Sequence, residues 1–263
     1  MCPKKNFPAE GIQITRYTRQ MEFSIEIFLL AAGASFVQRT IGFGFGIFIM
    51  TALPFLMPSY AEAVTLSGLL SLTSATVVML KYIRYVNWKR LLTVLAAFII
   101  FSSIAIFLLD RIEGRPMRMI LGVMLIVISL YFGLFKDKLQ KLIKPTASWQ
   151  LGAGVISGVM GGLFGMQGPP VVLYLTVSEP DKNHYMGMIQ TYAVLTNVTM
   201  LVVRIFNGYV TPAVGTTYLY ATGGLAIGVL LGNWAFRRIP NRIFTYIVYA
   251  YIAVSGAIIL LTA

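Results

Sequence analysis

Residues 40–58, TIGFGFGIFIMTALPFLMP, and residues 162–180, GLFGMQGPPVVLYLTVSEP, are two similar stretches that decide the fold. They lie about 122 positions apart, and each is a long apolar segment interrupted by glycines near its middle. Each ends at a proline, Pro58 or Pro180, and three further apolar segments follow it. The chain therefore consists of one unit of four apolar segments that occurs twice.

The composition is that of a membrane protein. Of the 263 residues, 57% are hydrophobic and 11% are charged, which leaves more apolar surface than a soluble domain of this length exposes. A helix needs about 20 apolar residues to cross a bilayer core. Such segments lie near residues 23–57, 61–80, 91–109, 118–135, 151–178, 187–205, 214–236 and 243–261. We predict an all-α integral membrane protein with seven to eight membrane segments in two four-segment repeats, segments one and five being broken at the Gly-rich motifs.

Polar stretches divide the chain into four parts. We expect a polar or interfacial N-terminal tail at 1–22, the first transmembrane repeat at 23–135, a basic cytoplasmic linker at 136–150 and the second transmembrane repeat at 151–263. The small residues Ala32-Gly33-Ala34 follow the first hydrophobic run as in a signal cleavage site. Because Glu26 interrupts that run and the apolar stretch continues past it, we interpret the run as the first membrane segment.

The formal net charge of +12 comes from short basic clusters between the apolar segments. Clusters so placed orient a membrane protein and contact anionic lipid headgroups, so we expect a lipid bilayer and not nucleic acid as the partner. If all eight segments cross the membrane, the repeats are parallel, and 13 Lys and Arg lie on the cytoplasmic side and 7 on the opposite side. Re-entrant segments one and five, which make the repeats inverted, leave 12 inside and 8 outside, and Arg39 is in neither count. The positive-inside rule does not separate the two arrangements.

The chemistry-bearing residues exclude several classes of protein. One cysteine, Cys2, and one histidine, His184, rule out a disulfide framework and a site with several His or Cys ligands. No His, Cys or carboxylate cluster offers a nucleophile or general base, so we expect neither an enzyme nor a cofactor. Glu26 and Glu62 lie in or beside apolar stretches, but a chain of carboxylates typical of a proton relay is absent from the sequence.

The Gly-rich breaks predict a binding site near the middle of the membrane. Non-helical backbone persists at membrane depth only where protein buries it or where it lines a polar cavity. After the first break we expect a helix from Ile47 to Phe55, and Pro169 and Pro170 suit the first turn of a helix after the second. Two helix N-termini at one point attract an anion. Paired halves with matching interrupted helices are typical of secondary transporters.

Arg39 adds a full positive charge beside the first break. An arginine at the centre of a membrane helix costs about 2.5–3.5 kcal/mol on insertion scales, and a bound oxyanion would offset this directly. The planar guanidinium also suits two oxygens of such an anion. The alternatives are that Arg39 extends to the membrane interface or pairs with Glu26 or Glu62.

The other candidate ligands are glycines and neutral polar groups. Gln38, Thr40 and Gln167 flank the breaks and Asn197 lies in segment six, where hydrogen bonding between helices is the competing role. The expected substrate-binding residues are Arg39, Gln38, Thr40, Gly42, Gly44, Gly46, Gly165, Gln167, Gly168 and Asn197, with no catalytic or metal-binding residue.

Two motifs together resemble the TauE/SafE family of membrane permeases, the sulfite exporter family: R-x-x-G-F-G-F-G from Arg39, and G-G-L-F-G-M-x-G-P-P from Gly161. The resemblance extends over about residues 25–261. It implies a secondary carrier for sulfite, thiosulfate, sulfonates such as sulfoacetate, or carboxylates, in a bacterial inner membrane. Gln167 departs from the pattern, since many members have glycine there.

The alternative function is a non-transporting membrane scaffold or auxiliary subunit, whose glycines only pack helices together. Direction of transport, coupling ion (proton, sodium or none) and oligomeric state are left open by the sequence.

Overall fold

The computed structural model describes residues 25–40, 43–109, 111, 115–135, 138, 140–179, 181–236 and 241–262. For residues 182, 233, 235, 236 and 241–248 it describes the backbone alone. The predicted N-terminal tail and the predicted site residue Gly42 lie outside the described residues. Within the described ranges the regular structure is helical, and no strand is present.

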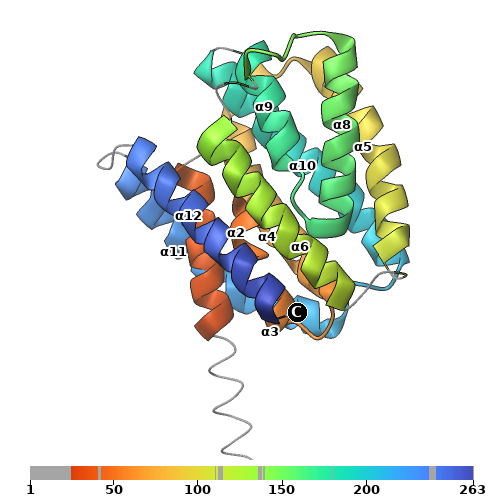
Figure 1. Ribbon diagram of the computed structural model, residues 1–263, viewed down its shortest axis with the longest axis vertical. Coiled ribbons are helices and arrows are strands. Elements are labelled where there is room, and N and C mark those ends of the chain that lie inside the picture. Colours follow the sequence, from red (N-terminus) through yellow and green to blue (C-terminus); the bar gives the residue numbers. More distant parts are fainter. Residues whose placement is uncertain are drawn as a thin grey trace, which may run out of the picture.

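The helices follow one another along the chain as Figure 1 shows. Residues 25–40 form the first described helix. It is followed by α2 (Phe45–Ile49), α3 (Leu53–Leu56), α4 (Tyr60–Tyr82), η1 (Ile83–Tyr85), α5 (Trp88–Leu109), α6 (Arg115–Leu130), η2 (Tyr131–Phe135), α8 (Ala147–Phe164), α9 (Gly168–Ser178), α10 (Lys182–Phe206), α11 (Pro212–Phe236) and α12 (Asn241–Thr262).

Among the described residues, five helical stretches are long and apolar enough to cross a membrane. They are Tyr60–Tyr85, Trp88–Leu109, Arg115–Phe135, Asn183–Phe206 and Pro212–Gly232. These stretches coincide with five of the predicted segments, so that part of the prediction is confirmed. Large apolar side chains on the outer surface, such as Leu219 at 73% exposure and Phe107 at 61%, suit contact with lipid tails.

The helix predicted from Ile47 to Phe55 is divided in two. α2 ends at Ile49, and α3 begins at Leu53 with Pro54 in its first turn. Proline lacks a backbone N–H, and its ring clashes with the carbonyl group four residues earlier, here that of Met50. The proline is tolerated only near the start of a new helix, which explains the interruption.

Residues 25–40 and the pair α2–α3 fold back on each other, and we call this unit hairpin one. Near its turn, a Cβ at Gly44 would lie 3.6 Å from Val37 Cγ1. Farther from the turn, a Cβ at Gly33 would lie 2.7 Å from Phe48 Cε1. The two limbs are therefore antiparallel, and hairpin one opens toward the end of the molecule where α4 begins.

Helices α8 and α9 form a second unit of this kind, hairpin two. α8 ends at Phe164, and Gly165 follows in the left-handed region with φ 68°. At the far end of the hairpin, Gln150 Nε2 donates to Tyr174 Oη at 2.8 Å. Hairpin two therefore opens toward the end of the molecule where α10 begins.

The two hairpins enter the molecule from opposite ends and meet at their tips. α4 and α10 are antiparallel neighbours, since the rings of Tyr85 and His184 are 5.5 Å apart and Asn197 Nδ2 donates to Ser71 Oγ at 3.2 Å. At the meeting point, a Cβ at Gly46 would collide with the carbonyl oxygen of Gly165. Glycine is thus required where the tips touch.

Glycines at four-residue spacing hold each hairpin against a long helix. In hairpin two they are Gly154, Gly158 and Gly162 of α8, which face α5. For hairpin one they are Gly224, Gly228 and Gly232 of α11, which face residues 25–40. A Cβ at Gly158, for example, would lie 2.9 Å from the carbonyl oxygen of Phe98. Such backbone-to-backbone packing is typical of membrane helices, and Figure 1 shows α8 lying along α5.

Candidate functional site

A small cavity, which we call the central cavity, lies between the tips of the two hairpins. Its volume is about 40 Å³. Since one water needs about 10–15 Å³ by this measure, the cavity has room for about three waters or one small ion. Its polar and glycine lining comprises Gln38, Gly44, Gly46, Ser71, Gly165, Gln167, Gly168, Gln190 and Tyr192.

The predicted site residues divide into those that line this cavity and those that do not. Lining it are Gln38, Gly44, Gly46, Gly165, Gln167 and Gly168. Arg39 lines a neighbouring cavity instead. Thr40 Oγ1 donates to the carbonyl of Phe36 in its own helix at 2.7 Å. Asn197 lies behind the wall, where its amide contacts Ser71.

The N-terminus of α9 presents few backbone donors to the central cavity. The first residues of a helix normally carry unpaired N–H groups, but Pro169 and Pro170 have none. Gly168 retains its N–H, and the buried side chain of Gln167 adds an amide. The Gln167 carbonyl is engaged by the hydroxyl of Ser157, which also contacts Tyr192 Oη at 2.6 Å. The site at this tip therefore combines one backbone donor and one amide with the positive end of the helix dipole.

Two buried polar atoms near the hairpin tips have no hydrogen-bond partner among the described residues: Ser67 Oγ and Asn197 Oδ1. A Cβ at Gly46 would lie 3.8 Å from Ser67 Oγ, and one at Gly165 would lie 3.6 Å from it. Buried polar atoms left unpaired by the protein are positions where water or a ligand supplies the missing contact.

Arg204 is a buried cation near the second break that sequence reasoning did not assign to the site. It lies at the end of the predicted segment 187–205, where the sequence indicates a charge at the membrane surface, but it is 2% exposed. Its Nη2 donates to the carbonyl of Gly162 at 3.0 Å and lies 3.5 Å from that of Gly161. These carbonyls belong to the last turns of α8, where the helix dipole is negative. Arg204 therefore offsets negative potential beside the central cavity.

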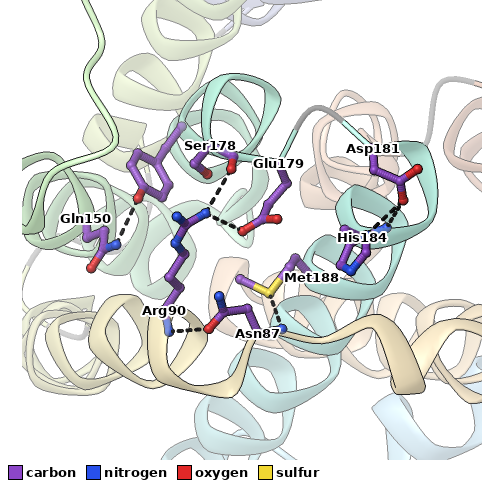
Figure 2. Close-up of polar contacts among 9 residues, drawn as sticks. Asn87, Arg90, Gln150, Ser178, Glu179, Asp181, His184 and Met188 are labelled. Carbon is purple, nitrogen blue, oxygen red and sulfur yellow. Dashed lines mark hydrogen bonds and ion pairs between the residues drawn. The ribbon is translucent and has the colours of Figure 1, made fainter.

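A polar cluster ties hairpin two to α5 at the end where α10 begins (Figure 2). Arg90 Nη1 forms an ion pair with Glu179 Oε1 at 2.7 Å and donates to the carbonyl of Ser178 at 2.8 Å. Asp181 caps α10 and forms a 2.9 Å pair with the His184 ring. The pKa of the Asp181 carboxyl is lowered most by the hydrogen bond from the backbone N–H of His184 and next by the hydrogen bond from the His184 ring.

Among the described residues, no group of three or more His, Cys, Asp and Glu side chains could hold a metal ion. The polar groups that line the central cavity are amides, hydroxyls and glycine backbone, with no carboxylate among them, and apolar side chains such as Phe43, Ile47 and Ile189 complete the lining. This chemistry suits hydrogen bonding to a small polar or anionic ligand.

The five candidate spans among the described residues and the apolar outer surface are those of a multi-pass membrane protein. A family model described as "Sulfite exporter TauE/SafE" matches residues 27–259. The chain therefore belongs to the sulfite exporter TauE/SafE family, a family of transporters, and the resemblance seen in the two Gly-rich motifs is confirmed. Neither the curated proteins nor the solved structures include a match to the chain.

Proposed function

We propose that this protein is a secondary transporter that moves small sulfur-containing or organic anions across the cytoplasmic membrane of a bacterium through the central cavity. Candidate substrates are sulfite, thiosulfate and sulfonates such as sulfoacetate. The observation that carries the proposal is a small cavity with a partly polar lining between two helix breaks, in a member of a transporter family. Cavities at paired helix breaks are typical substrate sites of secondary transporters.

The helix bounds support two inverted repeats, at 23–135 and 151–263, joined by the linker 136–150. The hairpins end at Leu56 and Ser178, which are 122 positions apart. The helices that follow begin at Tyr60 and Lys182, again 122 positions apart. Because the hairpins open toward opposite ends, the re-entrant arrangement explains these bounds better than parallel repeats do.

The charges support an orientation for this arrangement. The end where α4 finishes carries Lys81, Arg84, Lys89 and Arg90. Loop residues Lys138, Lys141 and Lys144 belong to the same end, since Gln140 Nε2 donates to Thr176 Oγ1 near the end of α9. The opposite end carries Arg111, Arg115 and Arg118 among the described residues. By the positive-inside rule, the first end is cytoplasmic.

Three features favour an anion in the central cavity. The positive end of the α9 dipole faces it, amide donors line it, and Arg204 cancels the negative end of α8 nearby. Its volume of about 40 Å³ suits an anion of sulfite size in this conformation. A larger sulfonate would require the hairpin tips to part.

The test is flux through the purified protein in proteoliposomes. Vesicles would be loaded with ³⁵S-labelled sulfite, thiosulfate or sulfoacetate, and release would be compared with that from protein-free vesicles. Gln167→Met removes the amide from the cavity, and we expect it to abolish flux. Gln150→Met is the matched control, since Gln150 is also buried and hydrogen-bonded but does not line the cavity.

The two outcomes separate the proposal from its alternative. Flux of at least one anion, lost in Gln167→Met and kept in Gln150→Met, supports transport through the cavity. If none of these anions moves through folded protein, the non-transporting scaffold or auxiliary subunit is favoured instead.

A further inference from the structure

A second cavity, which we call the outer cavity, adjoins the central one. Its volume is about 460 Å³. The polar residues that line it are Gln38, Arg39, Thr73, Ser74, Gln190 and Thr222. Among its described lining residues, Arg39 carries the charge.

The two cavities follow each other along α4 and α10. On α4, Ser71 lines the central cavity, and Val77 and Val78 line the outer one, closer to the helix end at Tyr82. On α10, Tyr192 lines the central cavity and Met186 the outer one, closer to the helix start. At about 1.5 Å per residue, the outer cavity extends up to about 10 Å farther toward the connection between α4 and α5, which we call loop 83–87 and which includes η1.

The wall between the cavities consists of side-chain amides. Gln38 and Gln190 line both spaces. Gln38 Oε1 accepts a hydrogen bond from Ser74 Oγ at 2.6 Å. A hydrogen bond of this kind contributes about 1 kcal/mol, and rotation of the Gln38 and Ser74 side chains opens this partition without movement of a helix.

On its other side, toward the start of α4, the central cavity is closed by packed backbone and core side chains. The tip residues Gly46 and Gly165 touch there, and Phe164 and Met166 are 3% and 1% exposed. Opening on this side needs a movement of whole hairpins, because packed interiors do not deform continuously. The structure is therefore closed by contact between hairpin backbones on this side and by side chains alone on the other.

Arg39 is held at the outer cavity by its contact with α11. A Cβ at Gly232 would lie 2.8 Å from Arg39 Cβ, so the stem of the arginine rests on a glycine face. We propose that the outer cavity is an anion-binding subsite built on Arg39, from which the anion reaches the central cavity through the Gln38 and Ser74 partition from the end that carries loop 83–87. This rests on the proposed function and assigns Arg39 to the approach of the anion, outside the central cavity.

Cysteine accessibility tests the subsite independently of flux. Cys2 is the one cysteine in the sequence, so Cys2→Ser gives a cysteine-free background. Thr222→Cys reports on the outer cavity and Ser71→Cys on the central cavity. Leu219→Cys, on the same helix as Thr222 and 73% exposed on the lipid-facing surface, is the control. The probes are two membrane-impermeant methanethiosulfonates, one with a sulfonate group and one with a trimethylammonium group.

We expect Thr222→Cys to react only with probe added on the side of loop 83–87. When Arg39→Gln is added, the reaction rate of the sulfonate probe should fall about tenfold relative to that of the cationic probe. Ser71→Cys should react more slowly, and Ser74→Ala should accelerate it without changing Thr222→Cys. Equal reactivity of Thr222→Cys and Leu219→Cys, access from the opposite side, or a probe ratio unaffected by Arg39→Gln would overturn the subsite. If the subsite is overturned in this way but the protein still transports anions in proteoliposomes, the proposed function stands. If the cysteines react as expected but no anion is transported, the proposed function is refuted and the subsite stands.

Discussion

Substitution of Gly46 by alanine tests whether contact between the hairpin tips organises the molecule. A methyl group at this position would overlap the carbonyl oxygen of Gly165, well inside the separation of about 3.3 Å at which carbon and oxygen normally meet. The obstacle is backbone, which cannot rotate away as a flexible side chain does. Overpacking of this kind costs about 1–3 kcal/mol, and we expect Gly46→Ala to fall in the upper part of that range.

Gly168 provides a matched control, because it lies 122 positions after Gly46, at the corresponding position of the other repeat. A Cβ there would have no neighbour within 4 Å, and its φ is not in the left-handed region. Gly168→Ala should therefore leave stability unchanged or raise it by up to about 1 kcal/mol through helix propensity.

The assay is thermal unfolding of the two variants and the parent protein in the same detergent. One kcal/mol corresponds to about 2–4 °C in a chain of this size, so Gly46→Ala should melt several degrees below the parent and below Gly168→Ala. Equal melting temperatures for the two variants would refute the tip contact.

Three further predictions concern single contacts. Arg204→Met should raise the KM for a transported anion roughly fivefold in proteoliposomes while the protein still folds, because a cation at the end of a helix contributes about 1 kcal/mol by offsetting the negative dipole there; an unchanged KM would contradict the electrostatic role. Gly228→Ala should lower the melting temperature because its methyl group would collide with the backbone of the first hairpin, whereas Gly152→Ala, with open space around it, should not. Arg90→Gln removes both the ion pair with Glu179 and the hydrogen bond to the Ser178 carbonyl, so it should increase hydrogen exchange at the end of α9. Because the hydrogen bond to the carbonyl is not an ion pair, the increase should occur in high and low salt alike. Protection equal to that of the parent would argue against this contact.

Local chemistry accounts for the parts of the fold that the sequence predicts well. Runs of about 20 apolar residues are a strong signal, and the five candidate spans lie where those runs are. Near the second break, α8 ends beside Gly165 and α9 begins at Gly168, since glycine permits the left-handed turn and proline suits a helix start. The division at Pro54 was also readable from proline chemistry, but the apolar run around it masked the signal.

Contacts between distant residues account for what was missed. Arg204 lies near the end of an apolar helix, where an arginine usually extends to the membrane interface. Its burial depends on the carbonyls of Gly161 and Gly162, more than 40 positions earlier, and nothing in its own segment signals them. The separate cavity beside Arg39 depends likewise on how α11 packs against residues 25–40. Sequence spacing placed Arg39 next to the first break but did not determine which cavity it lines.

The central claim is that a small anion binds between the tips of the two hairpins. Its most direct test is an experimental structure of the protein with selenite, a heavier analogue of sulfite whose selenium is located by anomalous scattering. The account predicts a selenium peak in the central cavity, bounded by Gly44 and Gly46 on one side and by Gly165 and Gly168 on the other. A single peak elsewhere, or an empty central cavity at selenite concentrations that saturate binding, would contradict it.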